Sequence, residues 1–493
     1  MTEARSLEAV NPATGRIIST YPLMNQAEIV LAIEQAHSGF QQWRQSDFSV
    51  RSKALTDASR ALRAKKVELA ECITQEMGKP IQQSFAEVEK CAWVCDYFAS
   101  NAQHHLSDER IKLDHKDAIV TAQPLGILFA VMPWNFPLWQ AFRAIAPALM
   151  AGNTLLLKGA SNVPGCSKAI QNIFDSCEIP QGVFTNMPIR STDAELVISH
   201  PKVRAVTLTG SEEAGRAVAS IAGANLKKCV LELGGQDPYL ILHDADLDLA
   251  ADRCAASRML CSGQVCIAAK RLIVVDDIYD QFFKLLQEKL HSYLMGDPMN
   301  PAFNIGPLAR LDLRQKVHQQ VEESIQQGAI LRQGGVIPDQ QGWWYPITIL
   351  EDVKPGMPAF DDEIFGPVLS LVHAKHDEHA IELASDTRFG LGAAIFSANV
   401  AKAQRIAIED IEAGCVAIND FVRSDPRVPF GGIKDSGYGR ELGKLGIHEF
   451  INSKSIVLAG LHRKKLTQSR AIKKDGWRPI FLHDCKDQEL NPD

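Results

Sequence analysis

Two cysteines, Cys261 and Cys266, lie five positions apart in the segment CSGQVCIAAKR. A cysteine can act as a nucleophile when its pKa is lowered or a base lies nearby, and when donors stabilise the developing oxyanion. The C-x4-C spacing, without a local histidine or third cysteine, does not favour a metal site. The segment supplies neither base nor donors, so it does not decide which cysteine reacts. A reversible disulfide between the two stays an alternative.

Two further segments carry candidate chemistry. In LELGG, residues 231–235, Glu232 stands in an apolar strand, where a carboxylate is costly unless it is paired or performs chemistry. An ion pair or a strand-end hydrogen bond is the alternative. In Thr209-Gly210-Ser211, a glycine turn opens a helix, and backbone N–H groups there can approach a phosphate. A tight turn without a ligand is the alternative.

Composition limits the function classes. A chain of 493 residues predicts two or three domains, and the net charge of −7 gives no support for nucleic-acid or anionic-membrane partners. The N-terminus has no apolar signal region, and no apolar run approaches the roughly 20 residues of a membrane span. The 11 cysteines are most simply reduced thiols. We therefore expect a soluble, cytoplasmic protein without a metal site.

The candidate residues need elements that position them. The first 100 residues predict helices, including one with apolar positions from Leu55 to Ile73 that ends at a capping Gly78. From residue 117, strands such as TLLLK, RAVTLTG and KCVLELGG alternate with helices, which predicts a parallel, doubly wound sheet. A second α/β stretch runs from about 235 to 430. Within it, residues 335–367 are rich in Gly, Pro and aromatics and predict mainly loop.

From the N-terminus to the C-terminus, the chain contains seven short motifs in this order: PWNFP, AGNTLLLK, TGSEEAGR, LELGG, SGQVCIAAKR, DEIFGPV and PFGGIKDSGYGRE. Together they resemble the aldehyde dehydrogenase superfamily from NPATG at residue 11 to NSKSIV at residue 452, and the similarity is greatest to bacterial succinate-semialdehyde dehydrogenases. The resemblance implies that Cys266 is the nucleophile, Asn135 an oxyanion donor and Glu232 the general base. Cys261 stands where the family typically has Asn. Glu232 favours hydrolysis, because relatives that acylate coenzyme A generally lack this base.

The same resemblance implies a site for NADP or NAD. The cofactor-binding residues that it implies are Trp134, Lys158, Ser161, Gly210, Ser211, Glu363 and Phe365. Lys158 matches a ribose-binding lysine. NAD-restricted relatives often carry Glu at the position of Ser161, where it repels a 2′-phosphate. A serine has no such charge, so NADP is permitted.

For the substrate, the resemblance implies that Arg143 binds a distal carboxylate, with Arg423 and Ser424 as further candidates. Leu260 stands where some such enzymes have a second arginine, and Arg258 is out of register. A surface ion pair is the alternative for Arg143. The expected reaction is NAD(P)-dependent oxidation of succinate semialdehyde to succinate through a thiohemiacetal and a thioester. The alternatives are broader aliphatic or other ω-carboxy aldehydes, or a non-catalytic relative.

The expected fold is a Rossmann-like cofactor domain, an α/β catalytic domain and a small β oligomerisation arm. The expected bounds are residues 1–106 and 125–234 for the cofactor domain and 235–448 for the catalytic domain. Residues 107–124 and 449–463 would form the arm. The exposed strand SKSIVLA in this arm predicts pairing between subunits, hence a homodimer or homotetramer. Residues 464–493 form a basic tail without an assigned role.

Overall fold

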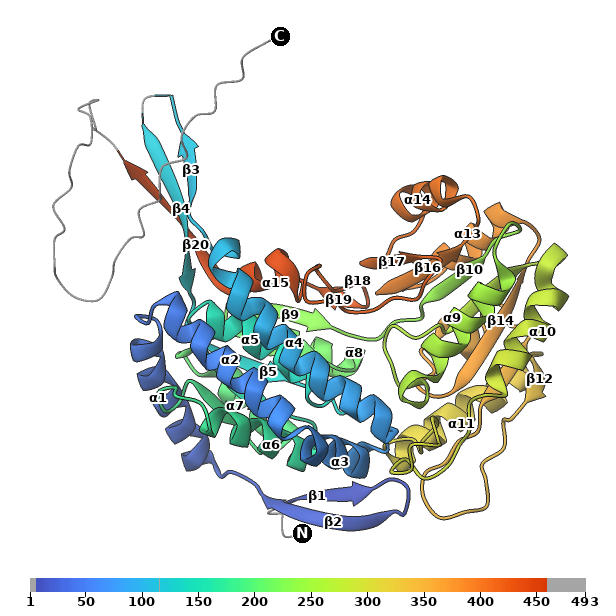
Figure 1. Cartoon of the computed structure of the whole chain (residues 1–493), viewed down its shortest axis with the longest axis horizontal. Helices are drawn as coiled ribbons and strands as arrows, with labels where there is room; N and C mark the ends of the chain where they lie inside the picture. The colour runs from blue at the N-terminus through green and yellow to red at the C-terminus, as the bar shows by residue number, and fades with distance from the viewer. Residues whose placement is uncertain (1–5, 115, 459–493) are drawn as a thin grey trace.

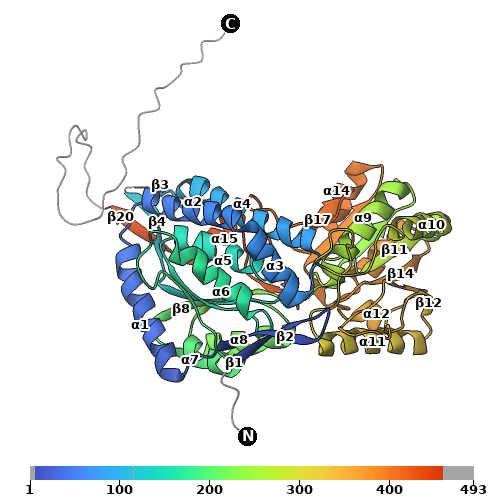
Figure 2. The same cartoon turned by 60° about the horizontal axis from the view of Figure 1, so that its bottom comes forward.

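The structure, a computed structural model, describes residues 6–114 and 116–458. Two α/β halves lie side by side, and a three-stranded arm projects from one of them (Figure 1). The view in Figure 2 shows the same division, with α9 (Leu247–Met259) and α10 (Tyr279–Leu290) in the half drawn on the right. This architecture confirms the predicted α/β class. The bounds of the predicted domains stay a prediction.

The first half is built on a six-stranded sheet with the order β19-β9-β8-β5-β6-β7. Its strands are β5 (Ile127–Val131), β6 (Thr154–Lys158), β7 (Phe184–Asn186), β8 (Val203–Thr209), β9 (Lys228–Glu232) and the antiparallel edge strand β19 (Gly437–Tyr438). Ile127 and Phe129 pack on one face of the sheet, whereas Leu128 and Ala130 pack on the other. Both faces are covered, so the strands are continuous apolar runs, as expected for a buried parallel sheet.

Helices cover both faces of this sheet. They are α1 (Gln26–Trp43), α2 (Phe48–Ala64), α3 (Lys66–Met77), α4 (Ile81–His105), α5 (Trp139–Met150), α6 (Pro164–Asp175), α7 (Ala194–Ser199), α8 (Glu212–Ala224) and α15 (Gly443–Glu449), with a short 3₁₀ turn at Ser191–Asp193. Gly78 ends α3 in the left-handed conformation, with φ of 78°, which confirms the predicted cap.

Two predictions for the N-terminal region were wrong. The single helix predicted through Leu55 and Ile73 is two helices, because the chain leaves helical geometry at Lys65, where φ is −99° and ψ is 18°. The predicted helical region is also preceded by a hairpin, β1 (Ser6–Asn11) and β2 (Arg16–Pro22). Most of β2 is exposed, so it lacks the alternation of apolar residues that marks a half-buried strand.

The second half contains a seven-stranded sheet with the order β12-β13-β14-β11-β10-β16-β17, parallel except for β12. Its strands are β10 (Pro238–Ile241), β11 (Arg271–Val275), β12 (Ile330–Gln333), β13 (Thr348–Glu351), β14 (Val368–Ala374), β16 (Gly392–Phe396) and β17 (Cys415–Ile418). The helices are α9 (Leu247–Met259), α10 (Tyr279–Leu290), α11 (Leu311–Gln326), α12 (Pro358–Asp361), α13 (Asp377–Ser385) and α14 (Val400–Glu409). Short pieces complete it: 3₁₀ turns at Leu260–Gly263 and Asp276–Ile278, and the pair β15 (Phe389–Gly390) and β18 (Ile433–Lys434). The predicted loop over 335–367 therefore contains a sheet strand, β13.

The arm consists of β3 (Glu109–Lys112), β4 (Asp117–Pro124) and β20 (Ile451–Leu458), in the order β20-β4-β3. All eight residues of β20 pair with β4 in antiparallel register, and the other side of β20 has no partner within the described residues. Residues 459–463 of the predicted arm and the tail lie outside the described residues. Within the described ranges, no helix combines the length and the apolar character needed to span a membrane.

Candidate active site

A sharp turn after α9 carries the two cysteines. Cys261, Ser262 and Gly263 are all left-handed, with φ of 52°, 53° and 76°. Glycine is required at 263, because a Cβ there would lie 2.1 Å from the carbonyl oxygen of Gly366. The turn directs residues 264–267 toward a cavity, and Cys266 lines it. Cys261 is fully buried, with its thiol toward the carbonyl oxygen of Asn135 at 3.5 Å. Of the two cysteines, Cys266 is the one that lines the cavity.

The cavity has a volume of about 250 Å³, which suits a small molecule. Besides Cys266, it is lined by the three residues predicted to bind substrate, Arg143, Arg423 and Ser424. Phe136, Trp139 and Phe430 supply apolar walls. The structure thus brings together Cys266 and all three predicted substrate residues, although they come from three separate segments of the chain.

Asn135 lies directly behind the nucleophile loop. Its side chain is 4% exposed, and its Nδ2 donates to the carbonyl oxygen of Gln264 at 2.9 Å. That bond uses one of the two N–H groups of the amide. The second N–H makes no hydrogen bond within the described residues, and Asn135 is not part of the cavity lining.

Glu232, the last residue of β9, belongs to a buried cluster of charges. Its side chain is 2% exposed, and neither carboxylate oxygen has a hydrogen-bond partner within the described residues. Burial, and then the nearby Glu441, raise the pKa of Glu232 well above its usual range. The carboxylate packs so closely on Gly431 that a Cβ there would lie 2.5 Å from its Oε1. Glu232 is not part of the cavity lining, and no direct contact joins it to Cys266.

Cys266 lies near cations and is partly buried. Burial raises the pKa of Cys266 to about 12, while Lys270 and Arg143 oppose the rise. The ammonium of Lys270 donates to the backbone carbonyl of Cys266 and pairs with Glu363 Oε1 at 2.9 Å. Lys270 thereby ties the nucleophile loop to Glu363, a predicted cofactor residue.

The predicted substrate residues differ in charge environment. Arg143 is 2% exposed, pairs with Glu441 at 2.5 Å and stacks on the ring of Phe430 at 4.7 Å. Its positive charge is therefore already balanced. Arg423 is half-exposed and pairs with Asp420 at 3.2 Å. Arg258 is fully buried and donates to the backbone carbonyl groups of residues 364 and 368, so it has a structural role.

Sequence reasoning missed one charged residue in the cavity. Lys90, on α4, lines the cavity and donates to Ser424 Oγ at 2.9 Å. The preceding turn of α4 contains Glu87, whose Oε1 accepts from the backbone N–H groups of Leu138 and Trp139 at 2.9 and 3.0 Å. Glu87 also pairs with the buried Lys79. This buried network fixes α4 against the start of α5, and so positions Lys90 beside Trp139 and Arg143.

The predicted cofactor residues lie at the ends of strands in the first sheet. Lys158 ends β6, is 5% exposed, and its Nζ makes no hydrogen bond or ion pair within the described residues. Burial lowers the pKa of Lys158. A buried cation without a partner fits a polar ligand such as a ribose or a phosphate. Ser161 follows it and is exposed, with no carboxylate at its position.

The remaining cofactor candidates come from other segments of the chain. Ser211 is the N-cap of α8, and its Oγ accepts from the N–H of Ala214 at 3.3 Å. At Gly210 the nearest atom to an added Cβ is a Leu208 methyl at 3.6 Å, so the preceding turn is open to a ligand. Trp134 and Phe365 meet edge to face, with ring centroids 5.7 Å apart.

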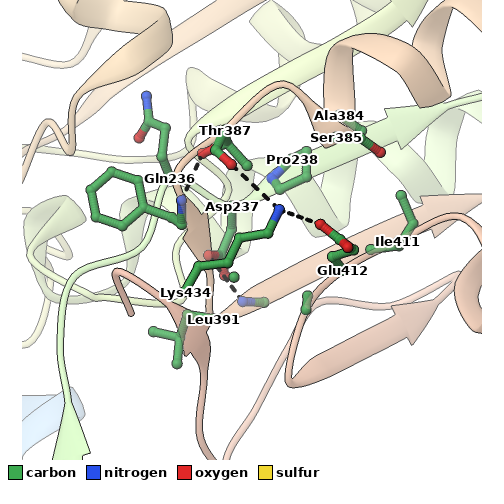
Figure 3. A pocket seen from close by; sticks show the side chains of 14 residues that line it. Gln236, Asp237, Pro238, Ala384, Ser385, Thr387, Leu391, Ile411, Glu412 and Lys434 are labelled. Atoms are coloured by element: carbon green, nitrogen blue, oxygen red, sulfur yellow. Dashed lines mark hydrogen bonds and ion pairs between the residues drawn. The ribbon is translucent and has the colours of Figure 1, made fainter. Parts of the chain in front are cut away.

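A second cavity lies in the half with the seven-stranded sheet, at the starts of the neighbouring strands β10 and β16 (Figure 3). Its volume of about 10 Å³ admits no more than one water molecule. Lys434 lies across it and pairs with Glu412 at 2.5 Å, while Asp237 accepts from the N–H of Gly392 at 3.1 Å. Burial raises the pKa of Asp237 to about 7. This cavity is too small for an organic substrate.

One group of side chains in the described residues has atoms close enough to hold a metal ion: Cys72, Glu76 and Cys166. Glu76 already accepts hydrogen bonds from the backbone N–H groups of Gly165 and Cys166 at 2.8 and 2.9 Å. Its position is explained by capping the start of α6. The group does not contribute to the cavity of Cys266.

Comparison with known proteins identifies relatives of the whole described chain. The model of the family described as "Aldehyde dehydrogenase family" matches residues 1–456. The chain is 44% identical over 456 residues to an Escherichia coli K12 protein named as an NAD(P)+ succinate semialdehyde dehydrogenase, covering 92% of this chain and 98% of the relative. It is 40% identical to a Deinococcus radiodurans protein named as an NADP(+) succinate-semialdehyde dehydrogenase, covering 92% and 94%. A solved structure of succinic semialdehyde dehydrogenase from Streptococcus pyogenes with NADP+ superposes with a TM-score of 0.89, at 36% identity, covering 91% and 99%.

Proposed function

Because this chain belongs to the aldehyde dehydrogenase family, we propose that it oxidises succinate semialdehyde to succinate with NADP or NAD, through a thioester on Cys266. The enzyme class and the use of NAD(P) follow from relatives that match more than nine-tenths of the chain. The observation that carries the substrate assignment is one cavity that contains a reactive cysteine and two internal cations, Lys90 and Arg143.

The first half of the reaction takes place at Cys266. Its thiolate attacks the aldehyde carbon and forms a thiohemiacetal. The oxyanion accepts hydrogen bonds from the free N–H of Asn135 and from the backbone N–H of Cys266. The dinucleotide, when bound, supplies a hydride acceptor for the thiohemiacetal carbon.

The second half is hydrolysis of the thioester. Glu232 has carboxylate oxygens without a hydrogen-bond partner in the described residues and a raised pKa, which make it a stronger base toward water than an exposed glutamate. The activated water attacks the acyl carbon, and the Cys266 thiolate leaves. Glu441 and Arg143 act on this base with opposite charges, because Glu441 raises the pKa of Glu232 and Arg143 lowers it.

The cofactor site supports NADP as well as NAD. Lys158 would hold the adenosine ribose, and the Ser161 hydroxyl would donate a hydrogen bond to a 2′-phosphate. Glu363, held by Lys270 and by the N–H of Gly235, would bind the nicotinamide ribose.

The test is a comparison of kcat/KM for succinate semialdehyde and for butyraldehyde, each with NADP and with NAD. The two aldehydes have the same chain length, and only one carries a carboxylate. We expect succinate semialdehyde to be preferred by at least about tenfold. Equal values would indicate an enzyme for broader aliphatic aldehydes. The absence of any burst of reduced cofactor with either aldehyde would indicate a non-catalytic relative.

Assembly and location belong to the same proposal. The unpaired side of β20, with Ile456 and Val457 exposed, supports a homodimer or a homotetramer that forms through the arm. Ten cysteines of the described residues are free thiols, which supports a reducing compartment such as the cytoplasm.

A further inference from the structure

The cavity contains two internal cations in different states. Arg143 has a carboxylate partner, because Glu441 Oε2 lies 2.5 Å from its Nε and both side chains are almost completely buried; its Nη2 has no hydrogen-bond partner within the described residues. Within the described residues, no carboxylate lies within ion-pair distance of Lys90 Nζ. Its neighbours are Ser424 Oγ at 2.9 Å and the ring of Trp139, whose centroid is 4.3 Å away. Lys90 therefore supplies the unbalanced positive charge inside the cavity.

The hydrogen bonds around Ser424 give this cation a geometry suited to an anion. Ser424 Oγ accepts from Lys90 Nζ at 2.9 Å and from Trp139 Nε1 at 3.1 Å. A hydroxyl oxygen has two lone pairs, so both acceptor positions are filled and the hydroxyl proton remains to be donated. Within the described residues that proton has no acceptor. Lys90 keeps two further N–H groups. The cluster Lys90–Ser424 thus presents donors alone, which matches an ionised carboxylate.

We propose that Lys90, together with the hydroxyl group of Ser424, binds the distal carboxylate of the substrate and determines the preference for semialdehydes over uncharged aldehydes. This inference rests on the proposed function and assigns its specificity to a residue outside the seven motifs. Arg143 then balances Glu441 beside the general base, and contributes less to the recognition of the carboxylate than its position in sequence implies.

The first test uses Lys90→Met, which keeps the length of the side chain and removes its charge. A charge-assisted hydrogen bond is worth roughly 10–150-fold in kcat/KM. We expect the ratio of kcat/KM for succinate semialdehyde to that for butyraldehyde to fall by about this factor. Lys66→Met, on neighbouring α3, removes the same charge from a half-exposed lysine outside the cavity and is the matched control. It should leave the ratio at its wild-type value.

The second test needs no variant. Burial, and then repulsion from Arg143, lower the pKa of Lys90 to about 8. The other ionisable groups that act on it are Cys91 and Glu87 on α4 and Asp425, the residue after Ser424, and these raise its pKa. Lys90 loses its charge as the pH rises, so the wild-type ratio should fall between about pH 7.5 and 9.5. The ionisation of Cys266 affects both substrates and cancels in the ratio.

The outcomes separate this inference from the proposed function. A wild-type enzyme without preference for succinate semialdehyde contradicts the proposed function itself. A wild-type preference that survives in Lys90→Met and does not change with pH overturns the role of Lys90 and assigns the carboxylate to Arg143. Two results together support the role of Lys90. The ratio of the two kcat/KM values is lower in Lys90→Met than in the wild type, and it falls with rising pH in the wild type but not in the variant. Should Lys90→Met not fold, the pH profile of the wild-type ratio decides.

Discussion

At the scale of single residues, the two cysteines of the CSGQVC segment should separate in function. Cys266→Ala should abolish turnover because it removes the thiol that lines the cavity, while cofactor binding, measured by fluorescence titration, should persist. Cys261→Asn should keep most activity. Asn tolerates the left-handed conformation found at position 261, and its amide can reach the carbonyl oxygen now contacted by the Cys261 thiol. An inactive Cys261→Asn enzyme together with an active Cys266→Ala enzyme would reverse the assignment.

The ionisation of Cys266 gives a pH prediction. Burial raises the pKa of this thiol to about 12, so in the free enzyme the reactive thiolate is a small fraction at neutral pH. That fraction grows roughly tenfold for each pH unit below the pKa. Alkylation of Cys266 by iodoacetamide, followed by mass spectrometry of the modified peptide, should therefore accelerate by roughly 100-fold between pH 7 and pH 9. A rate that is already constant over this range would mean that Lys270 and Arg143 outweigh burial.

The role of Glu232 can be isolated by kinetics. Glu232→Gln keeps the shape of the side chain but cannot accept a proton. The first turnover should still give a burst of reduced cofactor, because the thioester forms without this base. Steady-state hydrolysis should then slow by about 10²–10⁴-fold, as measured by stopped-flow absorbance. If burst and steady state fall together, Glu232 acts before the thioester or has a structural role.

At the scale of the elements, the contact of α4 with the start of α5 depends on one carboxylate. Glu87→Ala would leave Lys79 buried without its partner and would remove the acceptor of the Leu138 and Trp139 N–H groups. The loss of a buried charged partner costs about 3–5 kcal/mol in the free energy of unfolding. Urea denaturation followed by tryptophan fluorescence should show this loss.

Glu89→Ala is the matched control on the same helix. Glu89 makes exposed ion pairs with Arg63 and Lys66, at 2.9 and 3.5 Å, and such pairs contribute at most about 1 kcal/mol. Equal destabilisation by the two variants would show that the network of Glu87 is no stronger than a surface pair.

The elements also show what sequence patterns can predict. TLLLK and RAVTLTG were predicted as strands and are buried strands of the first sheet. A short, continuous apolar run between two helices is typical of a strand in a parallel sheet. The break at Lys65 has no Gly or Pro to mark it. β13 has only four residues and lies in a segment rich in Gly and Pro, so the local pattern predicted a loop there. Local patterns therefore predicted the fold class and most of the sheet strands, but not every boundary.

Sequence patterns also predicted some residues of the candidate site and missed others. Cys266, Arg143 and Ser424 were predicted from motifs, and they line one cavity. Lys90 was missed, because a lysine within AEVEKCAWV looks like an ordinary surface residue of an amphipathic helix. Its environment depends on Ser424, which lies 334 positions away in the chain. The pairing of Arg143 with Glu441 was missed for the same reason, since no local signal couples two segments so far apart.

At the scale of the whole molecule, the arm should control assembly. Val457 on β20 is 54% exposed and lies on the unpaired edge strand of the arm. A lysine there opposes the pairing of strands between subunits. Val457→Lys should therefore lower the molar mass measured by size-exclusion chromatography with light scattering. Val336→Lys, at a 70% exposed position in the other half, is the control and should not change it. An unchanged mass for both variants would exclude β20 from the interface.

The pairing of β19 with β9 also has a consequence for biosynthesis. Gly437 is the register partner of Glu232, so the first sheet acquires its last edge strand from a segment made much later. At about 5–20 residues per second, a ribosome needs roughly 10–40 s to synthesise the chain between them. During that interval the strand that carries Glu232 is an open sheet edge on the nascent chain, available to chaperones and to neighbouring nascent chains. The enzyme therefore cannot complete its first sheet until nearly the whole polypeptide has been synthesised.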